Sequence, residues 1–115
     1  MSDKIYQAIK AAVDEQAGRL LDVSHAIHGK PELAFREHFA CQTLTESLND
    51  FGLTTETGVF TLDTAFEASF ENGLGRGPTV AILAEYDALP GIGHACGHNL
   101  IATAALGATV ALNTV

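Results

Sequence analysis

The chain has 115 residues, of which 47% are hydrophobic and 17% are charged, and its formal net charge is -8. This length suits one domain, and so much apolar surface requires a folded core. The acidic balance argues against nucleic-acid binding and against an anionic membrane surface. The longest apolar stretch, residues 100–112, is shorter than the roughly 20 residues that cross a bilayer. Two cysteines, Cys41 and Cys96, are too few for a disulfide framework, so we expect a reduced, cytoplasmic protein.

The first half of the chain has a helical pattern. Apolar residues recur every three or four positions over residues 3–28, which predicts a helix that Gly29 and Pro31 end. The same spacing predicts a second helix over residues 32–51, with Gly52 as a left-handed terminator. Each helix would turn one apolar stripe toward a core.

The second half begins with strand patterns. Residues 53–57 and 64–70 are rich in β-branched and aromatic residues, and the second run alternates apolar with polar side chains. Residues 79–86 are apolar throughout their middle, as in a strand that is covered on both faces of an α/β sheet. Residues 71–78 and 87–99 contain glycine and proline and are predicted loops.

The last segment, residues 100–115, is predicted to be a buried helix that is apolar nearly all round. A buried strand and a buried helix need neighbours that three strands do not supply. We therefore predict a partial α/β domain over residues 1–115, in the order helix-helix-strand-strand-strand-helix, whose three-layer sheet is left incomplete. We expect this chain to be the front part of a larger domain or to self-associate.

The chemistry-bearing residues gather in the loop after the predicted buried strand, where open α/β sheets build their sites. His94, Cys96 and His98 alternate, so in an extended loop they could face one point. Imidazole and thiolate are good ligands for zinc and other late transition ions. Glu85 and Asp87 add carboxylates that could bind the metal or hold an imidazole by its other N–H. The spacing predicts a metal site that this short loop does not complete alone.

Two motifs resemble those of a known family. The first is a His-x-x-Pro-Glu-Leu run at residues 28–33 with a trailing Glu37. The second is Asp-Ala-Leu-Pro at residues 87–90, followed by Gly-His-Ala-Cys-Gly-His at residues 93–98. In this order they closely resemble the amidohydrolase branch of the M20 metallopeptidase family. The resemblance covers essentially the whole chain but only the front part of a family protein.

The resemblance implies roles for the second motif. Cys96 and His98 match two metal ligands, and the ion would be zinc or manganese, with cobalt as a further candidate. Asp87 matches the catalytic aspartate that orients and tunes the site. Glu85 lies where other branches carry a ligating histidine, and His94 matches a loop histidine that is not usually a ligand.

Other residues have structural interpretations. Asn99 replaces the commoner aspartate after Cys-Gly-His and could either cap the last helix or support the site. We expect Glu32 and Glu37 of the first motif, together with His28 and Pro31, to fix the turn between the two helices. Cys41 lies on the apolar stripe of the second helix, so we expect it in the core.

The family's reaction is hydrolysis of an amide bond, in N-acyl amino acids or dipeptides, by metal-activated water and a glutamate base. The base and the remaining ligands would come after Val115, so we expect this chain alone to have little or no activity. Two alternatives are a noncatalytic metal-binding domain that takes ligands from another chain, and a protein-interaction α/β module without metal.

Overall fold

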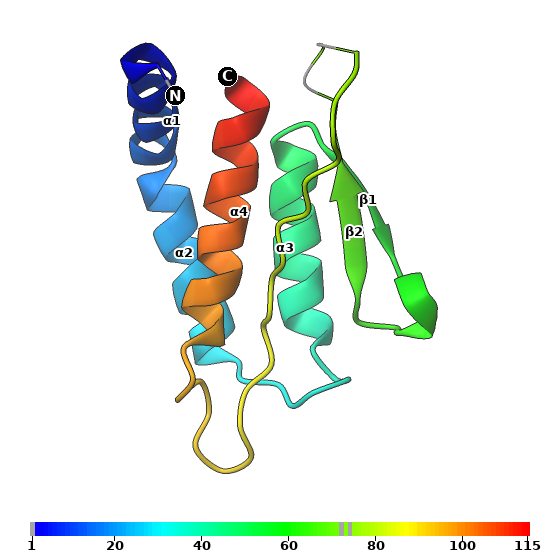
Figure 1. Ribbon diagram of the computed structural model, residues 1–115. Helices are drawn as coiled ribbons and strands as arrows, with labels where there is room; N and C mark the ends of the chain where they lie inside the picture. Colours follow the sequence, from blue (N-terminus) through cyan, green and yellow to red (C-terminus); the bar gives the residue numbers. More distant parts are fainter. Residues whose placement is uncertain (1, 72, 74) are drawn as a thin grey trace.

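The computed structural model describes residues 2–71, 73 and 75–115 of the chain (Figure 1). In chain order its elements are α1 (Asp3–Glu15), α2 (Ala17–Gly29), α3 (His38–Asp50), β1 (Thr54–Thr57), the short 3-10 helix η1 (Val59–Thr61), β2 (Phe66–Ser69) and α4 (His98–Thr114). The fold is thus mixed α/β, as the sequence predicted. Among these described residues, no helix combines the length and the apolarity that a membrane crossing requires.

The helix α4 is the centre of the arrangement. It packs against α1 and α2 on one side and against α3 on the other, and α3 carries the β1–β2 hairpin on its far side (Figure 1). The core lies where α2, α3 and α4 meet, and Ile27 and Leu44 are buried there completely or almost so. Its other buried members are Val23, Ala40, Leu48, Leu53, Ala102, Leu106 and Val110. Spacings of three and four in α2 and α3 confirm the predicted apolar stripes of these helices, whereas the part of the first stripe that lies on α1 contributes no buried residue.

The predicted single helix over residues 3–28 is broken at Gln16. This residue has φ -96° and ψ 7°, which ends α1 and begins α2. Gly18, two positions later, lowers the cost of a bend. The bend allows both helices to contact α4. Ser2 caps α1, because its hydroxyl accepts the Ile5 N–H at 3.4 Å.

The second helix begins at His38, so the predicted start at residue 32 is wrong. Glu32 does not continue a helix but folds back on α3. Its carboxylate accepts the backbone N–H of Phe39 at 3.0 Å and of Ala40 at 2.9 Å. These donors have no partner within the helix, and a negative charge is favourable at a helix N-terminus. The structure therefore confirms the turn-fixing role expected of Glu32.

The hairpin confirms the first two predicted strands. β1 and β2 are antiparallel, with Thr54 opposite Ser69 and Thr57 opposite Phe66. Phe66 and Ala68 pack against the core, as the alternating pattern indicated.

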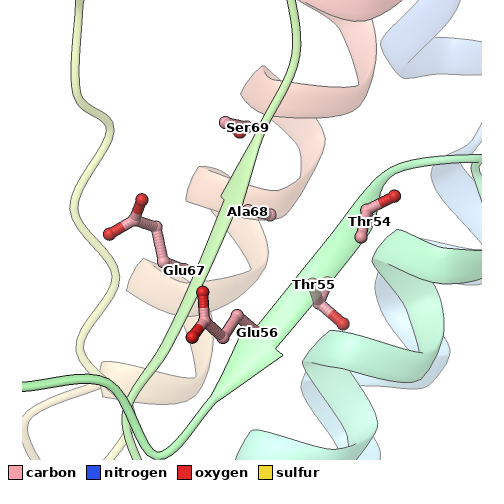
Figure 2. A pocket seen from close by; sticks show the side chains of 6 residues that line it. All are labelled: Thr54, Thr55, Glu56, Glu67, Ala68 and Ser69. Atoms are coloured by element: carbon pink, nitrogen blue, oxygen red, sulfur yellow. The ribbon is translucent and has the colours of Figure 1, made fainter.

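The hairpin also has a shallow hollow of about 140 Å³, which Figure 2 shows with the six residues that line it. Glu56 and Glu67 lie directly opposite each other there. The lining includes no histidine or cysteine, so this hollow differs from the site that the sequence predicted.

The predicted third strand, residues 79–86, does not form. This segment is drawn as an extended trace in Figure 1, and within the described ranges the sheet contains β1 and β2 alone. Val80 is 79% exposed and Leu83 is 82% exposed, so the expected cover on both faces is absent as well. A strand is stabilised by backbone bonds to a neighbour, and among the described residues neither β1 nor β2 pairs with this segment. The predicted three-layer sheet is therefore reduced to a hairpin beside helices.

The expected burial of the last helix is only half right. α4 begins at His98, and its Ala102, Leu106 and Val110 are in the core. Leu100, however, is 63% exposed on another side of the helix. The helix is apolar nearly all round, as predicted, but the described elements leave part of its surface exposed.

Candidate functional site

The loop that carries the second motif is tied to the first motif. The backbone N–H of Ala88 donates to the carbonyl of Glu32 at 2.7 Å, and Leu33 and Ala88 form a parallel bridge. The loop then turns back on itself, because Leu89 N–H donates to the Gly93 carbonyl at 2.9 Å. The two motifs, distant in sequence, therefore lie side by side at the start of α4.

His98 is held between two carboxylates at the first turn of α4. Its Nδ1 lies 2.8 Å from Asp87 Oδ1 and 3.1 Å from the Asp87 carbonyl oxygen. Its Nε2 lies 3.1 Å from Glu85 Oε2. The His98 side chain is 19% exposed, whereas that of Glu85 is 65% exposed. The structure thus brings together three of the predicted site residues, with Asp87 holding the ring and Glu85 at its outer nitrogen.

Cys96 and His94 occupy different surroundings from each other. Cys96 is an exposed free thiol. Both ring nitrogens of His94 are buried and have no hydrogen-bond partner among the residues that the structure describes, and the ring lies 6.3 Å from that of His28 between centroids. Burial, with the nearby His28 as a further cause, lowers the pKa of His94 and favours the neutral ring. His94 therefore packs against the first motif, while His98 faces the carboxylates.

The donor set fits part of a metal centre. Cys96 offers an exposed thiol and His98 offers Nε2, while Asp87 fixes the ring through Nδ1, as carboxylates do behind metal-bound histidines. Zinc takes three or four protein ligands. Within the described part of the chain, no three His, Cys, Asp or Glu side chains are arranged to hold an ion. Further ligands would have to come from other residues.

Asn99 lies outside the site cluster. Its Nδ2 donates to Ser24 Oγ at 3.1 Å and lies 3.4 Å from the Ser24 carbonyl oxygen. Both residues are buried, so this contact joins α4 to α2. The position before α4 is occupied by Gly97, without a side-chain cap. The expected helix cap at Asn99 is therefore wrong, and its amide serves the packing of two helices.

A partly buried polar group beside the site was missed from the sequence. Tyr86 lies between Glu85 and Asp87 in the chain but turns to the core, where its hydroxyl donates to the Thr64 carbonyl. Burial raises the pKa of Tyr86, and it also raises the pKa of the buried Cys41 thiol. The order of residues 85–87, an aromatic residue between two carboxylates, could have indicated that Tyr86 faces the core, since successive residues of an extended chain face opposite sides. The core position predicted for Cys41 is confirmed.

Known proteins resemble this chain over most of its length. No family model matches it. It is 45% identical over 110 residues to Xaa-Arg dipeptidase of Homo sapiens, covering 87% of the chain and 25% of that protein. It is 34% identical over 126 residues to a p-aminobenzoyl-glutamate hydrolase of Escherichia coli, covering 95% of the chain and 26% of that protein. Thermostable carboxypeptidase 2 of Saccharolobus solfataricus is 31% identical over 109 residues, covering 83% of the chain and 27% of that protein.

The chain thus spans about a quarter of the length of the curated relatives that it matches. Together, the two motifs and these relatives support placing it in the M20 peptidase and amidohydrolase family.

Proposed function

We propose that this chain is part of a metal-dependent amidohydrolase or dipeptidase that cleaves the amide bond of N-acyl amino acids or dipeptides. The observation that carries the proposal is the imidazole of His98, held at Nδ1 by Asp87 two residues after an exposed thiol. The similarity to a dipeptidase, a carboxypeptidase and an aminobenzoyl-glutamate hydrolase supports the same reaction class.

In this proposal Cys96 and His98 are two ligands of a divalent ion, which is zinc or manganese, with cobalt as a further candidate. When bound, the ion polarises the scissile carbonyl and acidifies water. Asp87 accepts a hydrogen bond from the Nδ1–H of His98, which fixes the tautomer and leaves Nε2 free to bind. Glu85 is exposed enough to leave Nε2 or to share the ion. The remaining ligands and the general base would be residues other than these four.

One observation favours the alternative of a noncatalytic metal-binding or protein-interaction module. Val80 and Leu83 expose a short apolar stretch immediately before the site. Clustered exposed apolar side chains mark interaction surfaces in many proteins. Such a module would bind an ion or a partner without cleaving amides, and turnover distinguishes it from the hydrolase.

The test uses the full-length protein supplied in turn with zinc, manganese or cobalt. N-acyl amino acids and dipeptides are assayed with and without a chelator. We expect turnover that the chelator abolishes, and His98→Gln should lower kcat/KM by about 100-fold or more, since a lost metal ligand removes the catalytic ion.

His25→Gln is the matched control, because His25 is exposed on α2 and belongs to neither motif, and we expect it to keep full activity. No turnover by the wild-type protein with any of these ions would contradict the proposal. Unchanged activity in His98→Gln would contradict the assigned ligand.

A further inference from the structure

A shallow, open cavity of about 180 Å³ lies beside the cluster of His98, Asp87 and Glu85. Its wall is partly apolar, with Phe35, Leu62 and Ala84, and both site carboxylates also line it. Complete small-molecule sites measure roughly 300–1,000 Å³. This cavity therefore has room for one side chain of a ligand.

Phe35 is held at the rim of this cavity in an unusual conformation. The residue is 72% exposed and its φ is 67°, in the left-handed region that bulky residues rarely adopt. Such a conformation persists only when its surroundings enforce it. Here the Phe35 N–H donates to Glu37 Oε1 at 2.9 Å, and the other Glu37 oxygen accepts the Thr64 hydroxyl.

Glu37 is buried, and both of its oxygens are already bonded, so it presents no free charge to the cavity. Its visible effect is to fix the backbone that carries the exposed ring. An apolar ring kept out of the core at the edge of a cavity is suited to contact a ligand.

We propose that Phe35 is a specificity-determining residue. Its ring forms one wall of a pocket that takes an apolar side chain of the substrate, next to the amide bond to be cleaved. This inference rests on the proposed function. Glu85 and Asp87 line the cavity and contact His98, the proposed metal ligand, so the cavity lies next to the proposed reaction site. Substrates with a large aliphatic or aromatic side chain are then preferred to those with glycine.

Phe60 is a natural control. It is also a phenylalanine with positive φ, at 55°, and it is 76% exposed. It lies on η1 and is not part of the wall of the cavity. Replacing it therefore removes an exposed, strained ring without altering the proposed pocket.

The experiment compares Phe35→Ala, Phe35→Leu and Phe60→Ala in the full-length protein. Dipeptides that differ in one side chain, from glycine through alanine and leucine to phenylalanine, are assayed for kcat/KM. Reduced-amide analogues of the same dipeptides are titrated by calorimetry, which measures binding without turnover. Thermal unfolding of each variant verifies that it folds.

We expect Phe35→Ala to weaken binding and kcat/KM for the leucine and phenylalanine members by roughly five- to tenfold relative to the glycine member. Phe35→Leu should lose less, and Phe60→Ala should match the wild type. An equal loss across the series, an equal effect of Phe60→Ala, or a wild type without preference for the larger members would overturn the inference.

The two proposals fail in different ways. A wild-type protein that cleaves none of the dipeptides refutes the proposed function, and the calorimetric series then judges Phe35 by itself. Preference for the larger analogues that Phe35→Ala abolishes supports the pocket. Absence of binding to every analogue overturns it.

Discussion

Replacing Glu32 by alanine should destabilise the protein by about 2 kcal/mol. The carboxylate accepts two N–H groups of the first turn of α3, at 3.0 and 2.9 Å, and it is partly buried. A hydrogen bond to a charged group contributes about 1.5–3 kcal/mol when buried, and a helix cap contributes about 0.5–2 kcal/mol. The two bonds act on one helix end and are partly solvated, so their contributions overlap rather than add. The bond from Ala88 to the Glu32 carbonyl is retained, because it uses the main chain.

Urea unfolding followed by circular dichroism measures this loss. Glu32→Gln keeps one acceptor oxygen without the charge, and we expect it to lose about half as much. Glu46→Ala is the matched control, because Glu46 is exposed on α3 and accepts a hydrogen bond from the Gln42 amide. It should change the free energy of unfolding by less than about 0.5 kcal/mol. If Glu32→Ala is as stable as Glu46→Ala, the assignment of Glu32 as the anchor of α3 is wrong.

Three further outcomes can be checked by the same method. Glu67→Lys should stabilise the hairpin by about 0.2–1 kcal/mol, since it replaces repulsion of Glu56 by attraction. If added salt leaves the gain in unfolding free energy of Glu67→Lys unchanged, the gain does not come from charge. Asn99→Ala should cost about 1–3 kcal/mol, because it leaves a buried partner on α2 unbonded, whereas the exposed Asn113→Ala should cost almost nothing. The folded protein favours the neutral phenol of Tyr86, because its pKa is raised there. The contribution of this residue to the free energy of unfolding is therefore complete below about pH 10 and is lost as the pH rises further. Tyr86→Phe should flatten this alkaline loss, and an equally steep loss in that variant would exclude Tyr86 as its source.

The local patterns predicted the helices and the hairpin well, because their information lies within short segments. The apolar stripes of α2 and α3 reappear in the core, and Phe66 and Ala68 point to it as their alternation indicated. Residues 79–86 show the limit of this reasoning. Their composition favours a strand, but a strand also requires a neighbouring backbone, and none pairs with them in the described part of the chain.

The site was predictable in its components and less so in its geometry. Residue types and spacing identified Asp87 and His98, and the structure places them 2.8 Å apart. We expected His94, Cys96 and His98 to face one point, but in the structure His94 packs beside His28 instead. That contact depends on the first motif lying against the loop, which is a tertiary feature that spacing in one loop does not contain. Asn99 was misassigned for the same reason, since its partner Ser24 is on another helix.

The proposed function depends on Cys96 and His98 binding the same ion, and X-ray absorption spectroscopy of the zinc-loaded full-length protein can establish whether they do. We predict a sulfur scatterer at about 2.3 Å from zinc, together with imidazole nitrogen at about 2.0–2.1 Å. The sulfur signal should disappear in Cys96→Ser, and the imidazole signal should fall in His98→Gln. A spectrum of fully loaded protein that shows no sulfur ligand, or one that neither substitution changes, would refute the shared ion.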